Sequence, residues 1–166
     1  MPNGTHSVAT LYVRDSEVYR PATPQETLAA AHRAITRRFK RGCTLTTPGL
    51  VREYLRITFA AVEYEVFCIL LLDSRRRLLA LREMFRGTID GAPVFPREVV
   101  KETLRQNAAA VILAHNHPSG VAEPSPADEL ITQRVKDALA LIEVPVVDHL
   151  VVAGDCVVSM AERGLV

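Results

Sequence analysis

The sequence predicts an α/β fold in which helices cover both faces of a central sheet. Two stretches, 66–72 and 108–114, are apolar at every position. Such runs are typical of central strands whose two faces are both covered. Helical patterns alternate with these strands, which favours helices layered on a sheet. The 166 residues, 48% of them hydrophobic, correspond to one globular domain, with or without an extension.

The N-terminal region is predicted to contain a short strand and one basic helix. Residues 7–13 are expected to form the strand. Thr23 can cap the following helix, Pro24 suits its first position, and Glu26 completes a capping box. Gly42 is expected to end the helix. Four basic residues crowd the last turn, where cations suit the helix dipole: Arg37, Arg38, Lys40 and Arg41.

The middle of the chain predicts two helices around a pair of strands. A Thr-Pro pair begins a helix over 47–59. The apolar strand 66–72 follows, and an arginine-rich turn over 73–77 leads to a neighbouring strand over 78–85. Pro96 then begins the next helix.

The second fully apolar strand, 108–114, leads into a polar tripeptide, His-Asn-His, at 115–117. A loop rich in proline and glycine follows. A Ser-Pro pair then begins a helix over 125–142. Two strands, 144–152 and 156–160, complete the expected sheet.

Charge is distributed unevenly along the chain. Residues 1–43 carry seven basic and three acidic side chains, a net charge of +4, whereas the whole chain has a net charge of +1. A strongly basic nucleic-acid-binding protein is therefore not indicated. Any attraction for phosphate is expected near the N-terminus.

The cysteines and the hydropathy indicate a reducing compartment. Cys43, Cys68 and Cys156 are odd in number and widely spaced, which argues against a disulfide framework and a thiolate zinc finger. No run reaches the roughly 18 apolar residues of a membrane span. The first residues lack the basic start and apolar stretch of a signal peptide. We therefore expect a cytoplasmic protein that does not enter a membrane.

A metal site is predicted where the second apolar strand ends. His115 and His117 alternate on an extended chain, so both imidazoles point the same way. Asp128 lies in the first turn of the following helix, so its carboxylate can approach the same point. Two nitrogens and one oxygen at about 2.0–2.2 Å, with a fourth position open to water, are typical of catalytic zinc.

Each half of this pattern also has a structural interpretation. Ser125-x-x-Asp128 is a capping box that satisfies amides at a helix start. Two histidines near the end of a buried strand need not bind metal. The two halves together, with a short Pro/Gly loop between them, are far more specific for a metal site than either half alone. A cap and a site residue can also share one helix start.

The pattern His115-x-His117-x7-Ser125-x-x-Asp128 resembles the metal motif of JAMM metalloproteases, the hydrolases with an MPN domain. Further segments along residues 44–166 are Glu65-Val66-Phe67, Leu72-Asp73-Ser74, Gly87-Thr88, Pro96-Arg97-Glu98-Val99-Val100, Asn107-Ala108-Ala109-Ala110, His115-Asn116-His117-Pro118-Ser119-Gly120, Pro124-Ser125 and Asp148-His149. With these segments, residues 44–166 as a whole resemble the RadC family, a bacterial branch of that group. The resemblance implies a three-layer MPN (JAMM) domain, with a mixed central sheet flanked by helices as in cytidine deaminases.

The resemblance also implies a mechanism. It assigns one Zn²⁺ per chain and an upstream glutamate as base, for which Glu65 is the best match and Glu63 the reserve. Zinc would lower the pKa of a water molecule towards ~7 and polarise the scissile carbonyl. Glu65 would accept the proton and pass it to the leaving amine. The Ser125 hydroxyl would hydrogen-bond the oxyanion or the water. The implied substrate is a peptide or isopeptide bond in an unidentified peptide or protein.

Two other functions stay open. Longer RadC proteins carry a helical region, similar to a helix-hairpin-helix, before this domain, and residues 1–43 are too short for it. The chain thus resembles short RadC-like proteins of plasmids and prophages, and DNA binding as a repair accessory is supported only by the basic N-terminal helix. A non-catalytic MPN binding module is the other alternative. Asp148 and His149 are expected to form a structural hydrogen-bonded pair, and the alternative is a role behind the metal ligands or towards the substrate. The oligomeric state is not indicated.

Overall fold

A computed structural model describes residues 10–38, 47–87 and 93–166. Its helices are α1 (Pro24–Arg38), α2 (Pro48–Phe59), α3 (Pro96–Arg105) and α4 (Pro126–Ala140). Its strands are β1 (Tyr12–Asp15), β2 (Val18–Pro21), β3 (Val66–Leu72), β4 (Leu78–Arg86), β5 (Ala110–Asn116), β6 (Val146–Ala153) and β7 (Cys156–Ser159). None of the helices described is long and apolar enough to cross a membrane.

Five strands form the central sheet in the order β4-β3-β5-β6-β7. β3 is antiparallel to both of its neighbours, whereas β5 and β6 are parallel. β7 returns antiparallel along β6. The sheet is therefore mixed, as the resemblance implies. Every residue of β3 and β5 is buried, which confirms that the two fully apolar runs form central strands.

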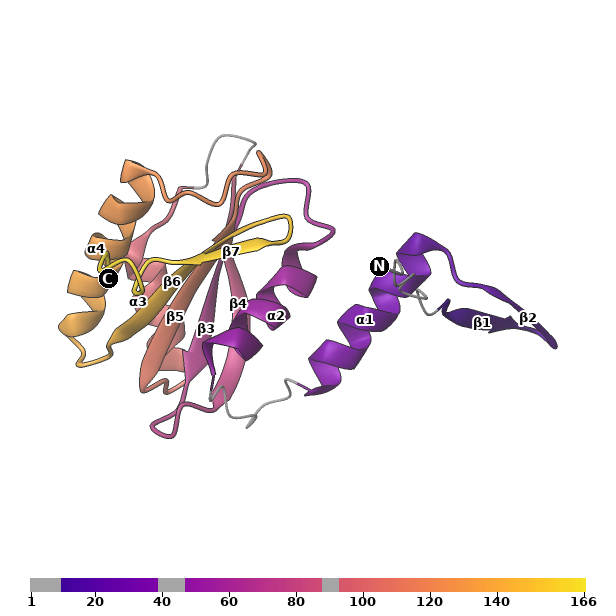
Figure 1. The fold of residues 1–166 in the computed structure, drawn as a ribbon. Coiled ribbons are helices and arrows are strands. Elements are labelled where there is room, and N and C mark those ends of the chain that lie inside the picture. The colour runs from indigo at the N-terminus through magenta and orange to yellow at the C-terminus, as the bar shows by residue number, and fades with distance from the viewer. Residues whose placement is uncertain (1–9, 39–46, 88–92) are drawn as a thin grey trace, which may run out of the picture.

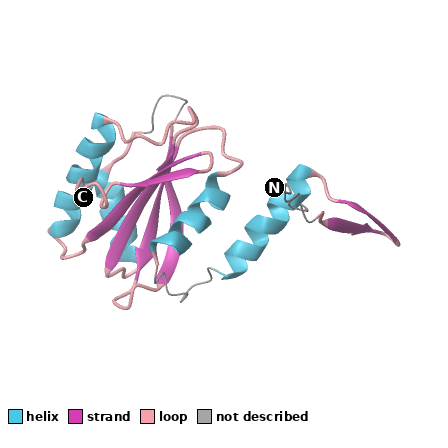
Figure 2. Cartoon of the chain, in the orientation of Figure 1, coloured by secondary structure: helices cyan, strands magenta, loops and turns pink. Residues whose placement is uncertain are grey.

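Helices cover both faces of this sheet, which gives three layers (Figures 1 and 2). On one face, α2 buries Leu55 and Phe59 against alternate residues of β3 such as Leu70. On the other face, α3 and α4 contribute Val99 and Leu139 to a second cluster with the intervening residues of β3. The two clusters follow from the two-residue period of a strand, which sends alternate side chains to opposite faces.

The N-terminal region differs from expectation. A hairpin of β1 and β2 is present, with Asp15 paired to Val18, and it adds no strand to the central sheet. A single strand over 7–13 was predicted, and residues 7–9 of it lie outside the described part. The turn was missed because it has no glycine or asparagine: Ser16 takes the left-handed conformation, with φ of 56°. The predicted helix end at Gly42 also lies outside the described residues.

The predicted capping of α1 is confirmed. The backbone N–H of Glu26 donates to Thr23 Oγ1 at 3.2 Å, and that of Thr23 donates to Glu26 Oε2 at 2.8 Å. Arg20 of the hairpin forms a bidentate pair with the same carboxylate, at 2.7 and 2.8 Å. The capping box therefore also joins α1 to the hairpin.

Candidate metal centre

Two histidines lie where the central strand β5 ends. His115 is within the strand, one residue before its last residue, and His117 directly follows it. The strand extends two residues beyond the predicted 108–114, so the sheet itself holds His115, which is only 1% exposed. The two imidazoles point the same way, as the strand period predicts.

Asp128 reaches these histidines from the first turn of α4. The Asp128 backbone N–H donates to Ser125 Oγ at 3.2 Å, and the Ser125 backbone N–H donates to Asp128 Oδ2 at 2.7 Å. The predicted capping box is therefore present. The Ser125 hydroxyl also donates to Asp128 Oδ2 at 2.6 Å. Because Oδ2 already accepts two hydrogen bonds, Oδ1 is the oxygen better able to bind an ion.

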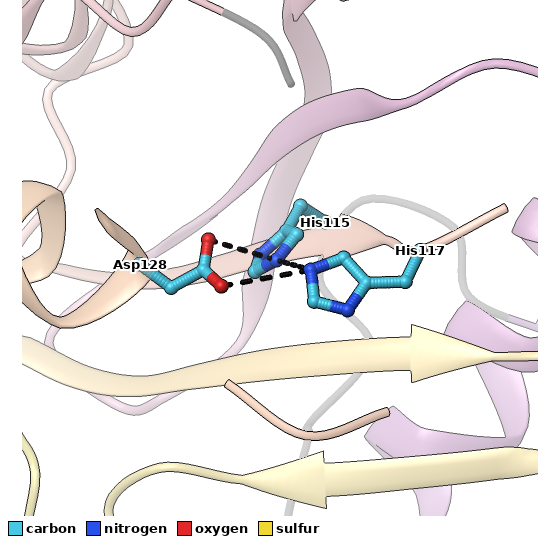
Figure 3. A group of neighbouring side chains, drawn as sticks. All are labelled: His115, His117 and Asp128. Carbon is cyan, nitrogen blue, oxygen red and sulfur yellow. Dashed lines mark hydrogen bonds and ion pairs between the residues drawn. The ribbon is translucent and has the colours of Figure 1, made fainter. Parts of the chain in front are cut away.

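His115, His117 and Asp128, here called the ligand triad, converge on one point (Figure 3). The Nε2 atoms of the two histidines are 2.9 Å apart. Asp128 Oδ1 lies 3.2 Å from His115 Nε2, and Asp128 Oδ2 lies 3.5 Å from His117 Nε2. Ligands about 2.05 Å from a tetrahedral zinc are separated from one another by about 3.3 Å. The distances between the two Nε2 atoms and between His115 Nε2 and Asp128 Oδ1 are close to that value, so the triad fits such an ion.

The tautomer of His117 is determined by a backbone carbonyl. His117 Nδ1 lies 2.8 Å from the carbonyl oxygen of Val121. A carbonyl can only accept, so Nδ1 carries the proton and donates it. In the neutral ring, Nε2 then presents a lone pair to the triad. The loop that follows β5 therefore leaves His117 Nε2 unprotonated and able to bind a cation.

His115 is oriented by a chain of hydrogen bonds behind it. Thr132 Oγ1 lies 2.5 Å from the carbonyl oxygen of Asp128, so the threonine hydroxyl donates to that carbonyl. Thr132 Oγ1 also lies 2.5 Å from His149 Nδ1, and it accepts a hydrogen bond from the N–H at that position. His149 Nε2 then accepts from His115 Nδ1 at 2.8 Å. His115 is left with an unprotonated Nε2, which faces the triad.

Burial and neighbouring groups set the charge of the residues around the triad. Burial, and next His115, lower the pKa of His149 well below its ordinary value, so this ring is neutral. Burial raises the pKa of Asp128, but the neighbouring His115 ring and the hydrogen bonds from Ser125 lower it by more, so the net pKa lies below the ordinary value. Two nitrogen lone pairs thus meet beside a carboxylate. Groups of this kind repel one another unless a cation lies among them.

The sequence interpretation of Asp148 and His149 is correct only for Asp148. Asp148 accepts hydrogen bonds from Ser159 Oγ at 2.7 Å and from the backbone N–H groups of His149 and Ala161 at 2.7 and 3.0 Å. Its role is structural. The His149 ring is fully buried and contacts a member of the triad instead.

Glu65 lies just before β3, and Asn116 holds its neighbours in place. Asn116 Oδ1 accepts from the Val66 backbone N–H at 2.8 Å, and Asn116 Nδ2 donates to the Tyr64 carbonyl at 2.9 Å. The Glu65 carbonyl itself accepts from the Gly87 N–H at 2.8 Å. Asn116 lies between His115 and His117, so the same tripeptide supplies the two histidines and holds the Glu65 segment.

A cleft of about 630 Å³ joins the predicted site residues. The triad, Glu65 and Ser125 all line it. Glu63, the reserve choice for the base, is exposed and is not among the lining residues. The other lining residues described are Phe67, Pro93, Val94, Pro118, Ser119, Ala127, Leu130, Ile131 and Arg134.

Comparison with known proteins agrees with this geometry. The profile of the RadC-like JAB domain matches residues 45–165. A protein from Nitrosococcus oceani named "UPF0758 protein" is 56% identical over 141 residues, which are 85% of this chain and 63% of the relative. A relative of the same name from Vibrio cholerae is 50% identical over 153 residues, 91% of this chain and 97% of its own length. The chain thus spans less than two thirds of the first relative but nearly all of the second. The chain belongs to the RadC-like JAB domain family.

Proposed function

We propose that this protein is a zinc-dependent hydrolase of peptide or isopeptide bonds. The observation that carries the proposal is the convergence of three unprotonated ligand atoms at a cleft that Glu65 and Ser125 also line. Zinc at the triad would supply a Lewis acid that activates water and polarises an amide carbonyl. Three protein ligands without a cysteine are typical of a catalytic zinc site, whereas structural sites are usually closed by four ligands.

Glu65 is the proposed general base and then general acid. Its position on the cleft wall lets it accept a proton from the attacking water and deliver it to the leaving amine. Asn116 accepts a hydrogen bond from the Val66 N–H and donates one to the Tyr64 carbonyl, which fixes the backbone that presents Glu65. Precise placement matters because proton transfer needs hydrogen-bond contact with the reacting atoms.

Ser125 has two proposed tasks. Its backbone N–H and its hydroxyl both hold Asp128 Oδ2, which orients the carboxylate for metal binding. The hydroxyl would stabilise the oxyanion of the substrate by rotating towards it, while the backbone hydrogen bond to Oδ2 remains.

Replacement of Glu65 by glutamine tests this function. Zinc-loaded protein is incubated with a mixed library of peptides and lysine-linked isopeptides, and products are identified by mass spectrometry. Glu65→Gln should retain zinc but lower cleavage by at least about 100-fold. Glu63→Gln is the matched control, because it removes the same charge two residues away, outside the cleft, and should cleave like the parent.

Two results would contradict the proposal. Equal cleavage by Glu65→Gln and the parent would show that Glu65 is not the base. A parent protein that holds zinc but cleaves no member of the library would favour a non-catalytic binding module.

We also propose a cytoplasmic location, because a reduced Cys156 on the surface suits a reducing compartment.

Single-stranded nucleic acid is a second candidate ligand, favoured by the N-terminal hairpin. Tyr12 and Tyr19 are 61% and 67% exposed, and the register places both on the face that carries Arg14. Exposed aromatic rings beside a cation are typical of surfaces on which bases stack. Binding of a labelled oligonucleotide should weaken as salt rises and fall about tenfold or more in Tyr12→Ala/Tyr19→Ala. Affinity that responds to neither change would exclude this candidate.

A further inference from the structure

One side of α4 forms a wall that runs along the cleft away from the ligand triad. Ala127, Leu130, Ile131 and Arg134 line the cleft and follow the i, i+3, i+4, i+7 spacing of a helix face. Seven residues of helix span about 10 Å. An extended peptide covers that length with about three residues, since each strand residue advances about 3.3 Å.

The middle of this wall is apolar. Leu130 is 62% exposed although it lines the cleft. Pro93, Val94 and Phe67 line the same cleft from outside α4. A cleft with apolar lining and few polar groups is a common form of binding site. The middle of the wall therefore suits an apolar side chain of a ligand.

The far end of the wall carries a positive charge. Arg134 is the one basic side chain among the described residues that line the cleft. It is exposed, and no described residue forms an ion pair or hydrogen bond with it. Of the acidic lining residues, Asp128 belongs to the triad at the start of the wall, and Glu65 lies two residues before Phe67, which pairs with His115. The cleft is therefore acidic at its catalytic end and basic about two helical turns away.

We propose that the substrate is a peptide with a carboxylate two to three residues from the scissile amide, and that Arg134 binds this carboxylate while an apolar side chain packs on Leu130. This inference rests on the proposed function and specifies its substrate class. A guanidinium suits this task, because its planar fork matches a carboxylate and stays charged at every physiological pH. The carboxylate can belong to an acidic side chain or to the C-terminus of the peptide.

Binding to a non-cleaving variant tests the inference without turnover. Zinc-loaded Glu65→Gln is titrated with fluorescent peptides that carry one leucine and, two or three residues away, Glu, Gln or Lys, with both ends blocked. A parallel set has Gln at that position and either a free or an amidated C-terminus. The two sets distinguish a side-chain carboxylate from a terminal one.

The expected result is a carboxylate preference of about tenfold or more over the matched amide. Adding Arg134→Gln should abolish this preference, and Arg134→Glu should reverse it in favour of Lys. Arg33→Gln, which removes an exposed arginine from α1, is the matched control and should leave the preference intact.

Three results would overturn the inference: equal binding of carboxylate and amide peptides, a preference that survives Arg134→Gln, or no binding of any peptide. Cleavage by the parent protein separates this failure from failure of the proposed function. A parent that cleaves amides without a carboxylate preference is a hydrolase whose specificity lies elsewhere.

Discussion

Thr132 lies at the far end of the hydrogen-bond chain that orients His115 in the triad. Its hydroxyl donates to the Asp128 carbonyl and accepts from His149, whose other nitrogen accepts from His115. Thr132→Val keeps the shape of the side chain but removes this hydroxyl. His149 then has no partner that fixes its proton on Nδ1. The opposite tautomer would place a proton on His115 Nε2, the atom that faces His117 and Asp128.

The size of the effect follows from burial. His149 is 0% exposed and Thr132 is 1% exposed, so water cannot replace the lost partner. A buried N–H without an acceptor costs about 1–3 kcal/mol of folding free energy. Loss of a hydrogen-bond partner behind a metal ligand typically weakens metal binding by about 10–100-fold. That range corresponds to about 1.4–2.7 kcal/mol of binding free energy.

Competition with a chelator of known affinity measures the zinc dissociation constant, and urea unfolding measures stability. Thr132→Val should lose both zinc affinity and stability within these ranges. Thr132→Ser keeps the hydroxyl and should bind zinc within about threefold of the parent. If Thr132→Val is folded and binds zinc as tightly as the parent, the hydrogen bonds from Thr132 through His149 do not set the tautomer of His115.

Three further predictions concern stability and reactivity. Leu113→Ala, in the fully buried β5, should lower the free energy of unfolding by about 2–5 kcal/mol in urea titrations. Burial, and next Glu83, raise the pKa of Cys68 to about 12, so iodoacetamide at pH 8 should label the exposed Cys156 and leave Cys68 unlabelled until urea is added, as peptide mapping would show. The Arg20 hydrogen bond, and next the Thr23 backbone, lower the pKa of Glu26 from 4.5 to about 2. The ionised carboxylate therefore stabilises the start of α1 above about pH 4.5, and this contribution is lost as the pH falls through about 2. Arg20→Ala should raise the NMR titration midpoint of Glu26, and an unchanged midpoint would refute the assignment.

The layered fold could be predicted because the sequence signal for its two central strands is unusually clear. The runs 66–72 and 108–114 are apolar at every position, and only strands covered on both faces need that pattern. The hairpin of β1 and β2 could not be predicted in the same way. Its turn uses Ser16 in the left-handed conformation, without the glycine or asparagine that normally marks such a turn.

The ligand triad could be predicted because its members are close in sequence and lie on elements of known period. The roles of His149 and Thr132 behind the triad could not be predicted, because the position of His149 depends on how β6 aligns with β5. Leu113 pairs with His149, and His115 pairs with Val151, which places the His149 ring on the same face as His115. The sequence contains no local signal for this register. Asn116 lies between the two histidines in the sequence, but its side chain binds the backbone on either side of Glu65.

Metal content is the most direct test of the central claim. The parent protein and His117→Ala are purified without metal-affinity resin or chelator, and zinc per chain is measured by elemental analysis. We predict about one zinc ion per parent chain and a large loss in the variant, since the triad supplies three ligands to one ion. A folded parent protein that contains no metal, even after zinc is offered, or a variant that retains all of it, would contradict the account.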